Sequence, residues 1–540
     1  MPLSRRDFLT TSGTAVLGGL AGLPALRTRL AQRPDTIVRG GTIYDGAGSP
    51  GVVGDLVITG QRITTVGGRI SATGVLEIDA RGLAVAPGFI DIHSHADGSL
   101  GDDPRAESVI RQGITTVVGG QDGSSSGVSA ETLSTATAER LARIAELRSA
   151  VNVAYMVGLG SVRGAIVGDA DRAATPDEIR RMTAIVESAL AAGACGASSG
   201  LEYTPGAFAR PDELIALCRP LASRRLPYAT HMRNEDDRLL DSIDESIAVA
   251  RGAGCPLQIS HLKTQGPRNW SKLDTVFARI DAARRAGVDV AFDRYPYTAY
   301  ATNLSNLFPV WSREGGASAL VRRAGDPATA DRVKNETVAK VDMIGGWNNV
   351  LISSGVAGTP DSSALAQRVG TYASQRGEDP YVVTLRLVGR GAGMVGFAMS
   401  EENLDRILAH PLGMVCSDGG AFSTDRPPRS NPHPRGLGSF PRVLGRYVRE
   451  RKALTLTDAI RKMTSLPASR LRLNDRGRLG PGLAADAVIF DPATIADRAT
   501  YEQPLQYPVG IHTVIVNGAM TFMNGERRED RGGKGLRAGQ

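Results

Sequence analysis

The sequence predicts an α/β protein built on a (β/α)8 TIM-type barrel, with a small β-sandwich domain formed from both ends of the chain. Three observations lead to this prediction. Short apolar strands alternate with helical stretches through the middle of the chain, eight strand positions can be counted there, and both ends are rich in short strands separated by glycine. A chain of 540 residues is long enough for a large core and a smaller domain beside it.

The composition is that of a globular protein and excludes several other classes. Hydrophobic residues at 41% and charged residues at 22% argue against disorder, and no apolar run after the N-terminal segment is long enough for stable membrane insertion. The formal charge of +7 is mild, and no dense stripe of Lys and Arg indicates a nucleic-acid partner. The four cysteines form no CxxC pair and are interpreted as core residues.

The first 33 residues have the order of an export signal. The paired Arg5 and Arg6 precede Phe8-Leu9, and a modest run rich in Gly, Ala and Leu follows. Paired arginines in this position are typical of a twin-arginine signal. We therefore expect segment 1–33 to engage the twin-arginine export machinery, which would deliver a folded protein to the periplasm or outside the cell. A frayed basic tail is the alternative interpretation.

Two separate segments, 34–88 and 477–528, are similar in pattern. Each contains short β-like runs, such as 36–39 in the first and 486–490 in the second. Since they flank a different kind of sequence, we expect them to pack together as one discontinuous β-sandwich. The remaining residues, 529–540, are expected to form a basic flexible tail.

The segment between them, 89–476, is expected to form the barrel. Helical periodicity appears between most of the strands. The predicted barrel strands end at His95, Gly119, Val157, Ser199, His231, His261, Asp293 and Asp418. Between about 303 and 400 the rhythm is disturbed, which indicates an insertion between the seventh and eighth strands that lies over the site.

Four of the seven histidines fall at predicted strand ends. His93 and His95 are one residue apart at the end of the first strand, so their side chains share a face. His231 and His261 end two consecutive strands. Because the carboxyl ends of barrel strands meet at one rim, the four imidazoles are expected to form a metal site. Any one of them alone could be a structural histidine.

Asp418 ends the last predicted strand and is the candidate catalytic residue. A carboxylate there could ligate a metal or take a proton from metal-bound water, whose pKa zinc lowers to about 7. Ser417-Asp418-Gly419 is also typical of a turn, so a helix cap is the alternative.

Several motifs carry a resemblance to a known family. Gly-Phe-Ile-Asp-Ile-His-Ser-His at 88–95 resembles the opening motif of the amidohydrolase superfamily. Within that superfamily, the chain is similar to the D-aminoacylase (N-acyl-D-amino-acid deacylase) family over about residues 35–525. The motifs that carry this similarity lie at 200–206, 230–235, 260–263, 295–298, 433–435 and 440–445.

The resemblance implies a hydrolase that removes the acyl group from an N-acyl-D-amino acid. Zinc-activated water would attack the amide, with Asp418 as general base and acid. His231 and His261 would hold the tight metal, and His93, His95 and Asp418 would form the second, catalytic side. One or two Zn2+ ions are implied, with another divalent metal as the alternative.

The resemblance also implies how the substrate carboxylate is bound. Lys263, a tyrosine of the Tyr295-Pro296-Tyr297 turn, and Arg435 match the family positions that grip it, with Tyr203 nearby. A planar guanidinium suits a carboxylate. An ordinary surface charge is the alternative for Lys263 and Arg435.

The chain departs from the family at the end of the second strand. The family has a metal-binding cysteine there, whereas this chain reads Gly119-Gly120-Gln121-Asp122-Gly123. A hard carboxylate thus replaces a soft thiolate. Asp122 is expected to ligate, and could bridge two metals; a turn residue without a metal role is the alternative.

Other functions remain open at this point. The same barrel could carry a peptidase for short D- or iso-linked peptides, or a hydrolase of cyclic amides. An exported binding protein on a degenerate barrel is a third interpretation, against which the complete set of four histidines and Asp418 argues.

Overall fold

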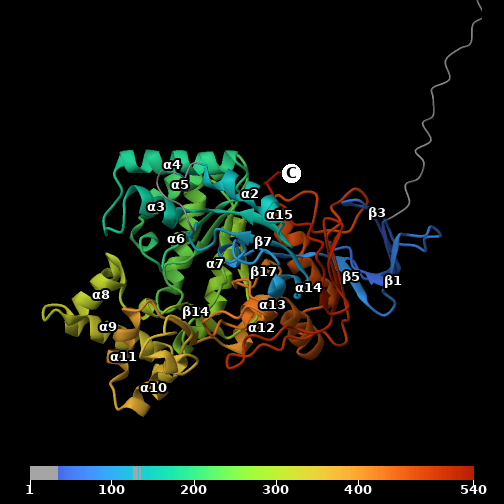
Figure 1. Cartoon of the computed structure of the whole chain (residues 1–540). Coiled ribbons are helices and arrows are strands. Elements are labelled where there is room, and N and C mark those ends of the chain that lie inside the picture. The colour runs from blue at the N-terminus through green and yellow to red at the C-terminus, as the bar shows by residue number, and fades with distance from the viewer. Residues whose placement is uncertain (1–34, 126–131, 133–134, 540) are drawn as a thin grey trace, which may run out of the picture.

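The computed structural model describes residues 35–125, 132 and 135–539. The predicted export signal lies outside these residues. Figure 1 shows a barrel in the centre, a β domain where the two chain ends meet, and a lobe of helices from the middle of the chain. Among the described residues, no helix has both the length and the apolar character needed to cross a membrane.

The centre of the molecule is a parallel (β/α)8 barrel, as predicted. Hydrogen bonding runs through β6-β7-β8 and through β9-β10-β11-β12-β13-β17, and β9 continues β8 after Met156. The barrel strands are β6 (Phe89–Asp91), β7 (Ile114–Gly119), β8 (Asn152–Tyr155) with β9 (Val157–Gly158), β10 (Ala197–Gly200), β11 (Tyr228–His231), β12 (Leu257–Ile259), β13 (Val290–Arg294) and β17 (Gly413–Val415).

The first and last strands meet through the residues just beyond their ends. Asp418 N donates to His93 O at 2.8 Å, and His95 N donates to Gly419 O at 2.9 Å. These bonds place the residue that follows the eighth strand beside the histidines that follow the first.

Amphipathic helices surround the barrel. α4 (Pro176–Ala191) shows why they form where they do: Thr175 and Glu178 make a reciprocal capping box, and proline occupies the first turn. The apolar side of α4 joins the same buried cluster as the strands. The other helices of this layer include α2 (Ala136–Glu146), α3 (Leu159–Ile166), α5 (Pro211–Ala222), α6 (Leu239–Ala253), α7 (Leu273–Arg285), α12 (Glu401–Ala409), α13 (Arg435–Arg442), α14 (Leu456–Met463) and α15 (Ser465–Arg470).

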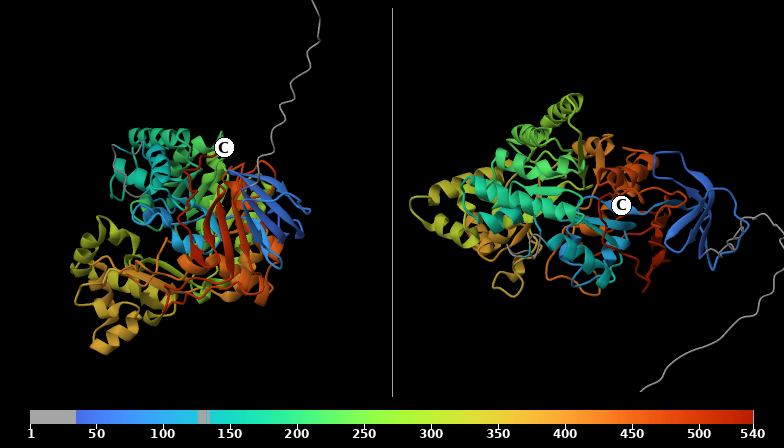
Figure 2. Two further views of the ribbon diagram at one scale, coloured as in Figure 1. Left: turned by 45° about the vertical axis from the view of Figure 1, so that its right-hand side comes forward. Right: turned by 90° about the horizontal axis from the view of Figure 1, so that it is seen from above.

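Strands from both chain ends form one β domain, as predicted. They join in a continuous nine-stranded sheet in which β5 pairs with β18 and thereby connects the two ends. Figure 2 shows the strands of the two ends side by side. The strands are β1 (Thr36–Ile43), β2 (Val52–Thr59), β3 (Arg62–Val66), β4 (Leu76–Asp79), β5 (Ala84–Pro87), β18 (Ala487–Phe490), β19 (Ile511–Val516), β20 (Ala519–Met523) and β21 (Glu526–Arg527).

The chain between β13 and β17 contains a separate lobe. It holds a three-stranded antiparallel sheet in the order β14-β16-β15 and the helices α8 to α11, which lie together at one side of the molecule (Figure 1). Its elements are β14 (Ala299–Asn303), α8 (Gly316–Gly325), α9 (Ala330–Met343), β15 (Val350–Ile352), α10 (Val369–Arg376), α11 (Pro380–Val388) and β16 (Gly393–Phe397). We call residues 299–400 the inserted lobe.

The prediction of a flexible C-terminal tail is wrong over its second half. Val153 N donates to Lys534 O and Leu536 N to Val153 O, both at 2.8 Å, so the segment pairs with β8. Leu536 is buried. The glycines permit this close approach, because a Cβ at Gly535 would lie 2.3 Å from Leu141 O.

Candidate active site

The predicted site residues gather at the carboxyl ends of the barrel strands. His231 is the last residue of β11, and His261 lies two residues beyond the end of β12. β6 ends at Asp91, so His93 and His95 follow the strand and are not part of it, contrary to the prediction. They nevertheless face the same region, with ring centroids 5.5 Å apart.

Three of the site residues have a positive φ angle, a backbone conformation that residues other than glycine rarely adopt. The φ angles are +51° at Asp122, +34° at His261 and +50° at Asp418. Such angles cost free energy and are common at functional sites, where the surrounding structure holds them. Each of these residues lies two or three positions after the end of a barrel strand.

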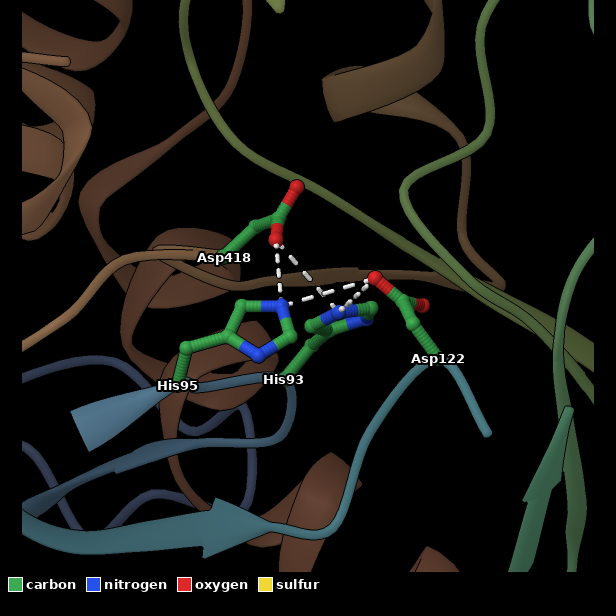
Figure 3. A group of neighbouring side chains, drawn as sticks. All are labelled: His93, His95, Asp122 and Asp418. Carbon is green, nitrogen blue, oxygen red and sulfur yellow. Dashed lines mark ion pairs between the residues drawn. The ribbon is translucent and has the colours of Figure 1, made fainter. Parts of the chain in front are cut away.

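The first half of the site joins His93, His95, Asp122 and Asp418 (Figure 3). Oδ2 of Asp122 lies 3.5 Å from Nε2 of His93 and 3.4 Å from Nε2 of His95. Oδ1 of Asp418 lies 3.5 Å and 3.1 Å from the same two nitrogens. Two imidazoles and two carboxylates therefore converge on one small volume.

The second half joins His231 and His261 to the same aspartate. Nδ1 of His231 lies 3.0 Å from Nε2 of His261. Oδ1 of Asp122 is 3.6 Å from that Nε2, and its Oδ2 is 4.0 Å from Nδ1 of His231. Asp122 thus belongs to both halves.

These donors fit a divalent metal. Both ring nitrogens of His93 and Oδ1 of Asp122 are buried and have no hydrogen-bond partner among the described residues. Buried polar atoms of this kind need an explanation such as a bound ion. Imidazole nitrogen and carboxylate oxygen are the ligand types of zinc and related metals.

The charges of the site support the same interpretation. Burial alone would raise the pKa of Asp418, but Arg435 and the neighbouring histidines outweigh burial and lower its pKa well below the usual range. Nη1 of Arg435 donates to Oδ2 of Asp418 at 2.6 Å. Asp418 is therefore held as a carboxylate, the form that ligates a metal or accepts a proton.

A cavity of about 750 Å³ opens over the cluster. Its wall includes the site residues His95, Asp122, His231, His261 and Asp418, together with residues of the inserted lobe from Tyr300 to Met394. The lobe thus lines the site, as expected.

Three predicted substrate-binding residues lie together in this cavity. Nζ of Lys263 is 5.9 Å, and the guanidinium carbon of Arg435 4.9 Å, from the ring centre of Tyr295. The hydroxyl of Tyr295 is buried and has no hydrogen-bond partner in the part of the chain that the structure describes, so it can bind a ligand. Lys263 is not free, because its Nζ lies 2.7 Å from Oε1 of Glu235.

The two other predicted tyrosines differ from each other. Tyr203 lines the cavity and its ring lies 4.6 Å from that of His231. Tyr297 is not among the residues that line it, so of the two tyrosines in the predicted turn Tyr295 is the one placed to contact a ligand there. The hydroxyl of Tyr297 lies 3.4 Å from Oδ2 of Asp497, so the tyrosines on the two sides of Pro296 contact different parts of the molecule.

Two acidic residues that the sequence analysis did not predict, Asp293 and Glu235, lie beside the histidines. Oδ1 of Asp293 lies 3.5 Å from Nδ1 of His93 and accepts the backbone N–H of His261 at 2.8 Å. Glu235 lies 3.2 Å from Nδ1 of His261. Asp293 ends a predicted barrel strand, a position that could have identified it, and Glu235 is four residues after His231.

A third group of possible metal ligands, Glu202, His231 and Glu235, lies at the edge of the site. Lys340 lies 3.4 Å from Glu202, and Lys263 lies 2.7 Å from Glu235. Because lysines already neutralise both carboxylates, this group does not require a metal.

The fold and the cluster define a metal-dependent hydrolase on a (β/α)8 barrel. The family model described as the amidohydrolase family matches residues 76–332 and 410–522, and the chain belongs to this family.

Individual relatives cover almost the whole chain. An N-acyl-D-glutamate deacylase of Alcaligenes xylosoxydans xylosoxydans is 37% identical over 507 residues, which is 91% of this chain and 94% of the relative. The structure of N-acyl-D-glutamate deacylase from Bordetella bronchiseptica with zinc and a phosphonate inhibitor is 36% identical, with a TM-score of 0.79, covering 94% of this chain and all of that one. A D-aminoacylase structure, described with a binuclear metal centre, is 35% identical with a TM-score of 0.79, covering 93% of this chain and all of that one.

Proposed function

We propose that this protein is a metal-dependent N-acyl-D-amino-acid deacylase. The observation that carries this proposal is the placement of two groups on one cavity. The histidine cluster with Asp418 lies on one side, and Tyr295 with Arg435 lies next to it. A substrate carboxylate bound by the second group would hold the neighbouring amide at the first.

The residues provide the chemistry of amide hydrolysis. A bound divalent metal would lower the pKa of a water molecule and polarise the amide carbonyl. Asp418 would take the proton from the attacking water and return it to the leaving amine as the C–N bond breaks, giving a carboxylic acid and a free amino acid. Arg435 and the hydroxyl of Tyr295 would orient the substrate through its carboxylate.

We propose Zn2+ as the metal, in one or two copies. His231 and His261 would hold one ion, and His93, His95 and Asp418 the other, with Asp122 shared between them. The relatives support this assignment, since one structure contains zinc and another is described with a binuclear centre.

A substrate panel tests the proposal. Purified, zinc-loaded protein should release amino acids from N-acetyl-D-amino acids and act much more slowly on the L-enantiomers. Dipeptides and hydantoins in the same panel test the two alternative activities, a peptidase and a hydrolase of cyclic amides. If the protein hydrolyses only dipeptides or only hydantoins, the corresponding alternative replaces the proposal. A protein without bound metal and without activity on any compound would favour a binding protein.

We also propose export to the periplasm or beyond, through the paired arginines Arg5 and Arg6. Cell fractionation of a bacterium with a twin-arginine system, expressing the full chain, should place the protein outside the cytoplasm. Replacing both arginines with lysine should retain it inside. Equal export of both forms would contradict this proposal.

A further inference from the structure

The two ring nitrogens of His231 face different surroundings. Nδ1 faces the cluster, 3.0 Å from Nε2 of His261, while Nε2 lies 3.1 Å from Oε2 of Glu202. A neutral imidazole carries its proton on one nitrogen only, and a carboxylate beside Nε2 favours the proton there. Glu202 therefore favours the tautomer whose Nδ1 lone pair is free for a metal.

Glu202 is in turn held by the inserted lobe through two contacts. Its Oε1 lies 3.4 Å from Nζ of Lys340 on α9, and its backbone carbonyl accepts Nη1 of Arg313 at 2.9 Å. Lys340 also pairs with Asp236. The Glu202 carboxylate thus lies between His231 of the barrel and Lys340, which is 138 residues from Glu202 in the sequence.

The position of Glu202 requires a positive charge. Glu235 also approaches Nε2 of His231, with its Oε2 3.8 Å away, so two carboxylates face the same ring nitrogen. Lys263 neutralises Glu235, and Lys340 pairs with the side-chain carboxylate of Glu202. All four side chains are largely buried, where an unpaired charge is costly.

We infer that Lys340 of the inserted lobe is a positioning residue of the metal centre, acting on His231 through Glu202. The lobe then does more than line the cavity, because it supplies the charge that keeps a barrel ligand oriented. This inference rests on the metal site of the proposed function.

The rate of metal loss tests this inference directly. Zinc-loaded wild type, Lys340→Met and Lys340→Arg are mixed with an excess of a coloured chelator. We expect Lys340→Met to release zinc about tenfold faster or more, the size of effect typical of residues that orient metal ligands. Lys340→Arg keeps the charge and should recover most of the difference. In steady-state assays at saturating zinc, kcat of Lys340→Met should fall more than KM changes.

Lys334→Met is the matched control. Lys334 lies on the same helix but is 47% exposed and pairs with Asp379 outside the cavity. It should release zinc at the wild-type rate. Equal rates for wild type and Lys340→Met would overturn the inference, as would equal acceleration in Lys334→Met and Lys340→Met, which would indicate general loosening of the helix.

If Lys340→Met folds poorly, as judged by the melting temperature of the metal-free protein, the variant Glu202→Gln tests the inference instead. Glu202→Gln keeps the size of the side chain and removes its charge. Faster zinc release supports the inference, and release at the wild-type rate overturns it. Since these rates do not depend on any substrate, they are independent of whether wild type hydrolyses N-acyl-D-amino acids.

Discussion

Asp122 faces His261 across the barrel mouth, with Oδ1 of the carboxylate 3.6 Å from Nε2 of the imidazole. Its other oxygen, Oδ2, lies 3.4 Å from Nε2 of His95 in the other half of the site. Oδ1 thus faces one half of the site, while Oδ2 lies nearest the other half and also 4.0 Å from Nδ1 of His231. A cysteine thiolate at this position would offer one sulfur atom to both, and sulfur selects softer metals than oxygen does.

Replacing Asp122 with alanine should weaken metal binding by at least about tenfold, because the residue shared by both halves of the site is lost. Zinc per chain, measured after dialysis against a series of chelator concentrations, checks this. Asp122→Cys should bind zinc and shift the preference away from Mn2+, which favours oxygen ligands. If Asp122→Ala binds zinc as tightly as wild type, Asp122 is a turn residue only.

Asp418→Asn should lower kcat by about 10²–10⁴-fold at saturating metal, the range for loss of a general acid–base residue. The change keeps the size of the side chain and removes its ability to take a proton. KM should change much less, because the carboxylate-binding residues remain. Wild-type kcat in this variant, with its metal content confirmed, would exclude Asp418 as the base.

Tyr295→Phe and Tyr297→Phe form a matched pair on one turn. Tyr295→Phe removes a hydroxyl that is free to bind the substrate and should raise KM about three- to tenfold, the equivalent of one hydrogen bond. Tyr297→Phe should leave KM unchanged, since that hydroxyl contacts Asp497 outside the cavity. Michaelis constants for one N-acyl-D-amino acid decide between them, and equal effects would contradict the assignment.

Arg470→Met should reduce stability without affecting the metal. Arg470 is buried at the opposite end of the barrel, where it donates to the carbonyl oxygen of Leu257 and pairs with Asp289. Loss of these bonds leaves buried acceptors unpaired and should cost about 2–3 kcal/mol. The exposed Arg180→Met, which loses only a surface ion pair, serves as the control in thermal unfolding. A melting temperature equal to wild type in Arg470→Met would contradict this role.

The barrel rim is the part of the site that the sequence predicts best. Strand ends recur with the spacing of one helix and one strand, and this spacing assigns His231 and His261 to one edge of the barrel. Asp418 lies beyond the insertion and is assigned to the same edge because it ends the eighth predicted strand. The histidines after β6 are also correctly grouped, although the strand ends before them, because the backbone bonds to the segment after β17 hold them at the same rim.

The contacts that hold the histidine cluster in place could not be predicted from the spacing of strands. Lys340 reaches Glu202 from an irregular insertion, and no period in the sequence encodes that contact. The choice between Tyr295 and Tyr297 depends on the direction of a turn, which two neighbouring tyrosines do not reveal. The C-terminal segment pairs with β8 through backbone atoms of glycine-rich sequence, where side-chain patterns carry no information.

Reconstitution of metal-free protein tests the central claim most directly. Zinc is removed with a chelator and added back in steps while hydrolysis of an N-acetyl-D-amino acid that the wild type cleaves is followed, in parallel for wild type and His261→Ala. We expect no activity without metal, recovery of wild type as zinc is added back, and no recovery of His261→Ala at the same zinc concentrations. Full activity of the stripped wild type, or equal recovery of His261→Ala, would contradict it.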